Sequence, residues 1–296
     1  MRILILGVSG LIGHKLLQEL SSDFEVFGTL HRKKSDYGNL TLFSGNNIIE
    51  SVDIVDFKML KGVLRAINPD VILNCVGITK RKIDLNTPFE PISINALFPH
   101  RLAGWAKENQ KRVIHFSTDC VFDGKVGNYS EESLTTAEDI YGRTKALGEI
   151  NYNHTLTIRS SFIGQELFDR TELLDWFLAQ DGKQLNGFKN TFYSGVSTIF
   201  MAQVVRNIIL NFPELSGIYQ LAPEKPISKF ELLSIAKEVF NVNVEIIPDE
   251  AHVHKPTLDA SKLKNKINLI VPSWKEMMSG LALNKEFYLN SQTIKK

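Results

Sequence analysis

Short apolar runs alternate along the chain with segments in which apolar residues recur at helical spacing. The runs are typical of buried strands, and the first six are predicted at 2–6, 25–30, 48–52, 71–74, 113–116 and 155–159. Helices are predicted between them, over 11–20, from near Asp56, over 88–108 and from near Asp139. Because strands and helices in alternation build parallel βαβ units, we expect a parallel sheet covered by helices up to Arg159.

The pattern is less regular beyond residue 162. Helices are predicted over 172–180, 199–210, 229–240 and, as the last one, 274–283. Strands are predicted at 184–188, 217–221 and 244–247. The helix at 199–210 and the strand at 217–221 are typical of a chain that returns to its main domain.

Three glycines follow the first predicted strand and open the first helix. Gly7, Gly10 and Gly13 have the spacing Gly-x-x-Gly-x-x-Gly, and Leu11 and Ile12 lie at the helix start. Glycines let a pyrophosphate approach the backbone, while a helix N-terminus offers free N–H groups and a positive dipole end. The segment therefore predicts a dinucleotide phosphate site, with a plain strand-to-helix turn as the alternative.

Other candidate segments also fall where predicted strands end, namely Asp53, 75–77 and 117–119. Ligands of open parallel sheets bind beyond the carboxyl ends of the strands. We therefore expect these segments and the glycine loop to surround one common site.

Tyr141 and Lys145 lie four residues apart on the helix predicted from near Asp139. This spacing places both on one helical face, about one turn apart. An ammonium beside a phenol favours the phenolate, so Lys145 is expected to lower the pKa of Tyr141 and to let it transfer a proton near neutral pH. Taken alone, such a pair is more often two surface residues.

The glycine loop, Ser117-Thr118-Asp119 at a strand end and Tyr141-x-x-x-Lys145 together resemble the extended short-chain dehydrogenases/reductases. The longer string STDCVFDG…YGRTKALGE resembles the dTDP-4-dehydrorhamnose reductase branch. The resemblance implies a Rossmann-type doubly wound parallel sheet with a smaller, discontinuous C-terminal substrate lobe. The implied NAD(P)-binding domain is 1–162 plus about 191–222, and the implied lobe is about 163–190 plus 223–296.

By the same resemblance, the protein is an NADPH-dependent reductase of a nucleotide-linked 4-keto-(6-deoxy) sugar. Tyr141 would donate the proton, Lys145 would also hold the nicotinamide ribose, and Thr118 would hydrogen-bond the reacting oxygen. Residues implied in cofactor binding, besides Tyr141 and Lys145, are Gly7, Gly10, Leu11, Ile12, Gly13, His31, Arg32, Asp53, Ile54, Cys75, Val76, Gly77 and Ser117. Residues implied in substrate binding are Thr79, Asp119, Cys120 and Ser161.

The choice of cofactor depends on the end of the second strand, where NAD-binding folds commonly carry an acidic residue for the ribose hydroxyls. Here the run is His31-Arg32-Lys33-Lys34, which suits a 2′-phosphate and favours NADP(H). Asp36 lies close by and keeps NAD(H) open, and a solvated basic loop is the alternative reading of the run.

For two further residues, the family resemblance implies a binding role, but a purely structural role fits the sequence equally well. Asp53, with Ile54, matches the adenine-contacting pair of the family, but Asp53 is equally suited to cap the helix that begins near Asp56. Asn95, on the helix at 88–108, matches a residue that binds a backbone group or water near the active site. A capping or buried polar role for Asn95 is equally compatible with the sequence.

Cys120 departs from the branch, because dehydrorhamnose reductases usually carry Tyr there, and this puts dTDP-4-dehydrorhamnose in doubt as the specific substrate. Related dehydratases have an Asp-Glu pair where this chain has Asp119-Cys120, so the absent acid favours reduction over elimination. The alternatives are a sister epimerase or dehydratase, and a non-catalytic NADP-binding regulatory subunit like that of methionine adenosyltransferase.

Composition limits the partners. The 296 residues carry a formal net charge of +1 and 43% hydrophobic residues, which is ordinary for a globular protein and predicts no nucleic-acid binding. No apolar run reaches about 18 residues, so no membrane span is expected.

Cys75 and Cys120 are expected to be free thiols in a reducing cytoplasm, and no His/Cys cluster has metal-ligand spacing. The expected partner is a nucleotide sugar, and a homodimer is left open.

Overall fold

A computed structural model describes residues 1–38, 40–84 and 86–292. Its centre is a seven-stranded parallel sheet with the order β11-β6-β5-β4-β1-β2-β3. The strand order reverses between β1 and β4, which confirms the predicted Rossmann-type sheet. The strands are β1 (Arg2–Leu6), β2 (Glu25–Thr29), β3 (Ile48–Ile49), β4 (Val71–Asn74), β5 (Arg112–Ser117), β6 (Thr155–Arg159) and β11 (Gly217–Gln220). The helices that cover the sheet include α1 (Gly13–Leu20), α2 (Phe57–Ile67), α4 (Phe98–Glu108) and α7 (Thr198–Asn211).

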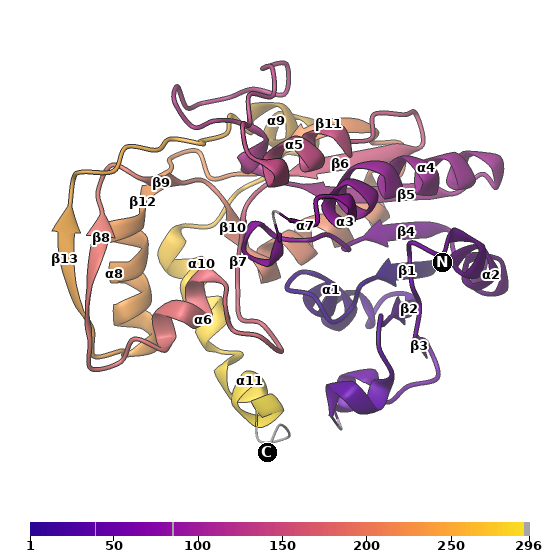
Figure 1. The fold of residues 1–296 in the computed structure, drawn as a ribbon, viewed down its shortest axis with the longest axis horizontal. Coiled ribbons are helices and arrows are strands. Elements are labelled where there is room, and N and C mark those ends of the chain that lie inside the picture. The colour runs from indigo at the N-terminus through magenta and orange to yellow at the C-terminus, as the bar shows by residue number, and fades with distance from the viewer. Residues whose placement is uncertain (39, 85, 293–296) are drawn as a thin grey trace.

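The sheet is buried on both faces. Within β1, Ile3 and Ile5 belong to the hydrophobic core shared with α1 and α7, whereas Leu4 and Leu6 belong to the core shared with α2 and α4. Figure 1 shows the helices on either side of the strands. Burial on both faces explains why the strands read as continuous apolar runs and not as alternating ones.

Capping residues fix the helix starts that the sequence predicted. Asp56 accepts hydrogen bonds from two N–H groups in the first turn of α2, both at 3.0 Å. Asp139 accepts one at 2.9 Å at the start of α5 (Ile140–Leu147). Such caps satisfy N–H groups that have no partner within the helix. The helix that carries Tyr141 and Lys145 therefore begins where predicted.

The helix predicted over 88–108 is not uniform. It consists of α3 (Phe89–Pro91), a π-helical segment η4 (Ile92–Leu97) and α4. Asn95 lies in the π-helical segment and makes two hydrogen bonds to the backbone of Ile78, with its Oδ1 at 2.8 Å from the N and its Nδ2 at 3.0 Å from the O. The prediction that Asn95 binds a backbone group is confirmed, and π turns of this kind are frequent at functional sites.

The C-terminal half contributes three small sheets beside the main one. They are β7 (Phe162–Ile163) with β10 (Val196–Ser197), β9 (Phe192–Tyr193) with β12 (Ile227–Ser228), and β8 (Gln184–Phe188) with β13 (Glu245–Asp249). The helices of this region are α6 (Leu173–Leu178), α8 (Lys229–Phe240), α9 (Ser261–Ile267), α10 (Trp274–Ala282) and α11 (Lys285–Gln292). In Figure 1, β8, β13 and α8 lie together at the left, away from the central strands.

Two of these helices were not predicted. The segment 274–283 was expected to be the last helix, but α11 follows α10, and α9 lies in a segment for which no helix was expected. Both have short, strongly polar sequences that carry little helical periodicity. The remaining short turns are η1 (Lys34–Tyr37), η2 (Thr41–Phe43), η3 (Lys80–Lys82) and η5 (Asp119–Val121).

No helix in the described ranges is both long and apolar enough to cross a lipid bilayer. Nor do they contain a group of three or more His, Cys, Asp or Glu side chains arranged to hold a metal ion.

Candidate active site

The glycine loop is packed too closely for side chains. Gly7 has a φ of +82°, and a Cβ on Gly13 would lie 2.1 Å from the carbonyl oxygen of Gly7. Leu11 is half-buried and Ile12 is buried, while Gly10 is exposed. No side chain caps the N-terminus of α1 in the described part of the chain. The exposed loop and uncapped helix end fit a phosphate group, which would accept from the free N–H groups.

The end of β2 presents positive charge to solvent. His31, Arg32 and Lys33 are exposed, and the backbone N–H of Arg32 donates to the hydroxyl of Tyr37 at 3.3 Å. Asp36 is also exposed, within η1. The basic run is thus accessible at the carboxyl end of the strand.

Asp53 is exposed and Ile54 is buried just before α2. The carboxylate of Asp53 accepts from the N–H of Val55 at 2.9 Å, and Asp56 is the residue that caps the helix. The capping alternative for Asp53 is therefore wrong. Its side chain closes a local turn at the strand end, which leaves a second carboxylate oxygen free of this hydrogen bond.

The loop after β4 joins the glycine loop to the catalytic helix. A Cβ on Gly7 would meet the side chain of Val76 at 3.0 Å, and a Cβ on Gly77 would lie 4.0 Å from the Nζ of Lys145. Cys75 is partly buried and is not in a disulfide. The hydroxyl oxygen of Thr79 is buried and has no hydrogen-bond partner among the described residues, so it is available to a ligand.

Thr118, Asp119, Cys120 and Ser161 form one hydrogen-bonded cluster at the ends of β5 and β6. The same carboxylate oxygen of Asp119 accepts from the Thr118 hydroxyl at 3.1 Å and from the Ser161 hydroxyl at 2.6 Å. The N–H of Cys120 donates to the Thr118 hydroxyl at 3.1 Å. Burial, together with the charge of Asp119, raises the pKa of the Cys120 thiol to about 12. The thiol is consequently protonated at neutral pH.

Tyr141 faces this cluster from α5, with its hydroxyl near that of Thr118, which lowers the pKa of Tyr141 slightly. Burial is the main influence on Tyr141 and raises its pKa well above the usual value, with a further rise from the charges of Cys120 and Asp119. The expectation that Lys145 lowers this pKa is therefore wrong in this structure. Desolvation of the phenolate outweighs the attraction of a cation one helical turn away.

Lys145 is buried, and its Nζ donates to the carbonyl oxygen of Phe116 at 2.6 Å. Burial lowers the pKa of Lys145 to about 8, and the charge of Glu149 opposes the change. The ammonium thus lies between β5, the loop at Gly77 and the helix of Tyr141. This position suits contacts with a dinucleotide in the groove as well as with the phenol.

Ser117 has a partner away from the groove. Its hydroxyl donates to Glu149 at 2.7 Å, and Glu149 also binds Arg159 through two hydrogen bonds of 2.7 Å. The side chains of Glu149 and Arg159 are only 5% and 4% exposed. Ser117 therefore supports the ion pair that ties the end of α5 to β6.

The strand ends thus bring together the glycine loop, the loop at Gly77, Lys145 and the Thr118–Ser161 cluster, whereas Ser117 is bound to Glu149. The family model described as "RmlD substrate binding domain" matches residues 1–283. The chain belongs to the RmlD substrate binding domain family. This membership confirms the resemblance to the dTDP-4-dehydrorhamnose reductase branch that the motifs indicated.

Several proteins are similar to this RmlD family member over most of its length. A dTDP-4-dehydrorhamnose reductase of Sinorhizobium fredii is 27% identical, over 93% of this chain and 95% of its own. Methionine adenosyltransferase 2 subunit beta of Xenopus tropicalis is 23% identical, over 89% and 81%. The crystal structure of dTDP-4-dehydrorhamnose reductase from Bacillus anthracis in complex with NADP shares the fold, with a TM-score of 0.79, 19% identity and coverage of 96% and 99%.

The RmlD family member also has two further candidate site residues that the sequence did not reveal. Tyr193 has a buried hydroxyl without a partner in the described chain, and Lys229 is half-buried at the start of α8. Burial raises the pKa of Tyr193, and the negative charge of Asp119 raises it further. Burial lowers the pKa of Lys229, and the charge of Asp119 partly offsets this change. Both residues come from segments outside any motif. A single tyrosine in a two-residue strand or a single lysine at the start of a helix is not a distinctive sequence signal.

Proposed function

We propose that the protein is an NADPH-dependent reductase of a nucleotide-linked 4-keto sugar. The observation that carries the proposal is the proximity of Thr118 to Tyr141, beside Lys145 and next to the glycine loop. The loop and the uncapped α1 fit the pyrophosphate of a dinucleotide, and the relatives named above include dTDP-4-dehydrorhamnose reductases.

The residues divide the chemistry among them. The bound cofactor supplies the hydride, and the protein orients it against the carbonyl carbon. Tyr141 keeps its proton at neutral pH because of burial and gives it to the oxygen of the reduced carbon. Thr118 holds that oxygen by a hydrogen bond. Lys145 holds the ribose of the cofactor and stabilises the phenolate that remains on Tyr141 after the proton has left.

Elimination of water is disfavoured at this site. A dehydratase needs an acid–base group beside Asp119, and the chain has Cys120 there with a thiol pKa of about 12. A thiol that stays protonated is a poor general base near neutral pH. Net reduction therefore explains the residues better than elimination does.

The C-terminal segments supply the substrate lobe in this proposal. A cavity of about 170 Å³ is lined by Arg81, Trp176, Phe188 and Lys229, among others. Aromatic rings are suited to contact the base of a nucleotide, while guanidinium and ammonium groups are suited to its diphosphate. Lys229 lines this cavity, and it is close enough to the catalytic cluster for the charge of Asp119 to offset part of the lowering of its pKa by burial. The nucleotide would therefore extend from the catalytic cluster toward α6 and α8.

We expect the reaction to consume NADPH in proportion to the loss of a 4-keto nucleotide sugar. With NADPH deuterated at the transferred position, the label should appear at C4 of the sugar product, because the hydride goes to the keto carbon. The measurement is mass spectrometry and NMR of products from a panel of dTDP-, UDP- and GDP-linked 4-keto sugars.

Other outcomes of this experiment would contradict reduction. Product formed without net loss of NADPH would indicate an epimerase or dehydratase that recycles its cofactor. The similarity to methionine adenosyltransferase 2 subunit beta favours a second candidate, a binding subunit. No turnover of any keto sugar, with tight NADP binding and a stable protein partner, would support that candidate.

Replacement of Arg32 by Ala should narrow a preference for NADPH over NADH. A charge-assisted contact with the 2′-phosphate contributes about 1.5–3 kcal/mol, or roughly tenfold or more in affinity. Dissociation constants of both cofactors, measured by fluorescence titration, test this. Arg65→Ala, on the exposed face of α2, is the matched control and should change neither constant. Equal affinities of the unaltered protein for NADPH and NADH would contradict the expected preference for NADPH. Asp36 would then be the next residue to replace.

A further inference from the structure

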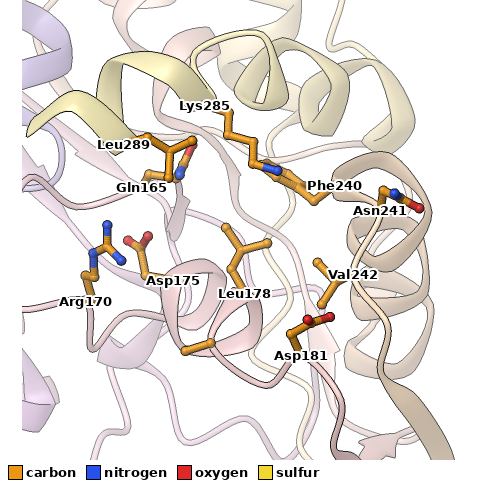
Figure 2. A pocket seen from close by; sticks show the side chains of 11 residues that line it. Gln165, Arg170, Asp175, Leu178, Asp181, Phe240, Asn241, Val242, Lys285 and Leu289 are labelled. Atoms are coloured by element: carbon orange, nitrogen blue, oxygen red, sulfur yellow. The ribbon is translucent and has the colours of Figure 1, made fainter. Parts of the chain in front are cut away.

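A second, larger cavity lies outside the proposed active site. It has a volume of about 330 Å³, at the lower end of the range for small-molecule sites, and lies between α6, the end of α8 and α11. None of the residues proposed to bind cofactor or substrate lines it. Figure 2 shows Gln165, Arg170 and Asp175 gathered at one side, and Leu178, Phe240 and Val242 facing the remaining space.

The polar side of the cavity offers two hydrogen-bond acceptors. Gln165 is only 4% exposed, and its Oε1 is buried without a partner among the described residues. Asp175 is buried as well, and burial raises its pKa to about 6, so that it is largely ionised at neutral pH. A buried acceptor without a donor is costly. One oxygen of Asp175 already accepts from the backbone N–H of Glu166. An ammonium group between the two side chains would give the Gln165 oxygen its donor and pair with the Asp175 carboxylate.

A cation stands beside these acceptors. Arg170 is exposed at the rim, and in the described part of the chain its guanidinium donates no hydrogen bond and forms no ion pair within 4.0 Å. Its charge nevertheless acts on Asp175, which shows that the two groups are near each other. A guanidinium fork matches a carboxylate in geometry. The polar side therefore presents acceptors for an ammonium next to donors for a carboxylate.

Much of the remaining wall is apolar, although Asp181, Asn241 and Lys285 also line the cavity. Leu178 of α6, Phe240 of α8, Val242 and Leu289 of α11 line the space beyond the charged groups. An apolar body attached to the charged head would cover these side chains and remove their surface from water. Both charges and an apolar body on one small molecule describe an apolar α-amino acid.

We propose that this cavity binds a small zwitterion of the apolar α-amino acid type. Its ammonium would lie between Gln165 and Asp175, its carboxylate on Arg170, and its side chain against Leu178 and Phe240. The bound molecule would contact α6 and α11 together.

Helix α11 connects the cavity to the glycine loop. Leu289 lines the cavity, and the adjacent Tyr288 is buried with its hydroxyl 2.8 Å from the Nε2 of His14. The Nδ1 of His14 is 2.8 Å from the carbonyl oxygen of Gly10. Because a carbonyl only accepts, Nδ1 carries the proton and the tyrosine donates to Nε2. A ligand that holds α11 in place would therefore hold Gly10 and favour cofactor binding.

The test is calorimetry with leucine, isoleucine, valine, methionine and phenylalanine, with isoamylamine and isocaproate as leucine analogues that lack one charged group. We expect at least one amino acid to bind and both analogues to bind at least tenfold more weakly than leucine. Arg170→Gln and Asp175→Asn should each weaken binding at least tenfold. Arg170 is exposed and Asn retains an acceptor at 175, so both variants should fold, and Arg65→Gln is the control.

Coupling is tested by the dissociation constant of NADPH with and without the bound amino acid. We expect the amino acid to tighten NADPH binding severalfold, and Tyr288→Phe, which removes the hydroxyl, to abolish that change while amino-acid binding persists. The proposed site would be overturned if no amino acid binds, or if isoamylamine and isocaproate bind as tightly as leucine. Binding with an unchanged NADPH affinity would overturn the coupling. Neither result depends on the identity of the sugar substrate.

Discussion

Replacement of Tyr141 by Phe should lower turnover by about 10²–10⁴-fold, because it removes the proton donor and keeps the ring. Tyr141 lies on α5, and its hydroxyl is near Thr118 and the charge of Asp119. Affinity for NADPH should therefore change little. Steady-state rates with the keto sugar that is turned over, together with cofactor titrations, measure both effects.

Lys145→Met is the companion to this variant. It should reduce both turnover and cofactor affinity, since Lys145 lies beside Gly77 as well as on the helix of Tyr141. Near-normal turnover of Tyr141→Phe would eliminate the tyrosine as donor. In that case Thr118, which is hydrogen-bonded to Asp119, would be the next hydroxyl to replace.

Replacement of Arg159 by Met should destabilise the fold by about 3–5 kcal/mol, because it leaves the buried carboxylate of Glu149 without its cation. The pair is almost fully buried, with two hydrogen bonds of 2.7 Å and side-chain exposures of 4% and 5%. It also joins β6 to the end of α5, so the loss should loosen the helix of Tyr141. Urea unfolding followed by circular dichroism measures the free energy of unfolding.

A second replacement separates the charge from the packing. The double variant Arg159→Met, Glu149→Met should recover part of the lost stability, since no buried carboxylate is left without its cation. The recovery is only partial because the buried Lys145 loses the charge of Glu149. Lys275→Met breaks the exposed pair with Glu238, whose side chains are 64% and 65% exposed, and should cost only about 0–1 kcal/mol. A cost for Arg159→Met as small as that of the surface control would show that Glu149 is stabilised by other groups.

Elements with strong local signals were predictable from the sequence. The glycine loop between β1 and α1 and the helix starts near Asp56 and Asp139 are short-range features, and they appear where expected, although the cap of α2 is Asp56 and not Asp53. Helix α11 was not predictable, because what holds it is the contact of Tyr288 with His14 at the other end of the chain. The two-residue strands β7, β9, β10 and β12 are too short to show any periodicity.

The same division holds for the site. Thr118, Tyr141 and Lys145 were recognisable because their spacing is a motif, and the fold brings them together. The pKa of Tyr141 was predicted in the wrong direction, since the sequence shows its neighbour Lys145 but not the extent of burial. Tyr193 and Lys229 join the cluster only through tertiary contacts, which no local pattern encodes.

The hydrogen bond between His14 and Tyr288 has a consequence for synthesis of the protein, because 274 residues separate its two partners. The glycine loop leaves the ribosome early, and β1 can pair with β2 and β4 once about a quarter of the chain has emerged. Only after α11 has been made does His14 gain its tyrosine. Nascent or prematurely ended chains should therefore contain a formed sheet edge and still bind the dinucleotide weakly, so that cofactor affinity reports on whether translation has passed Tyr288.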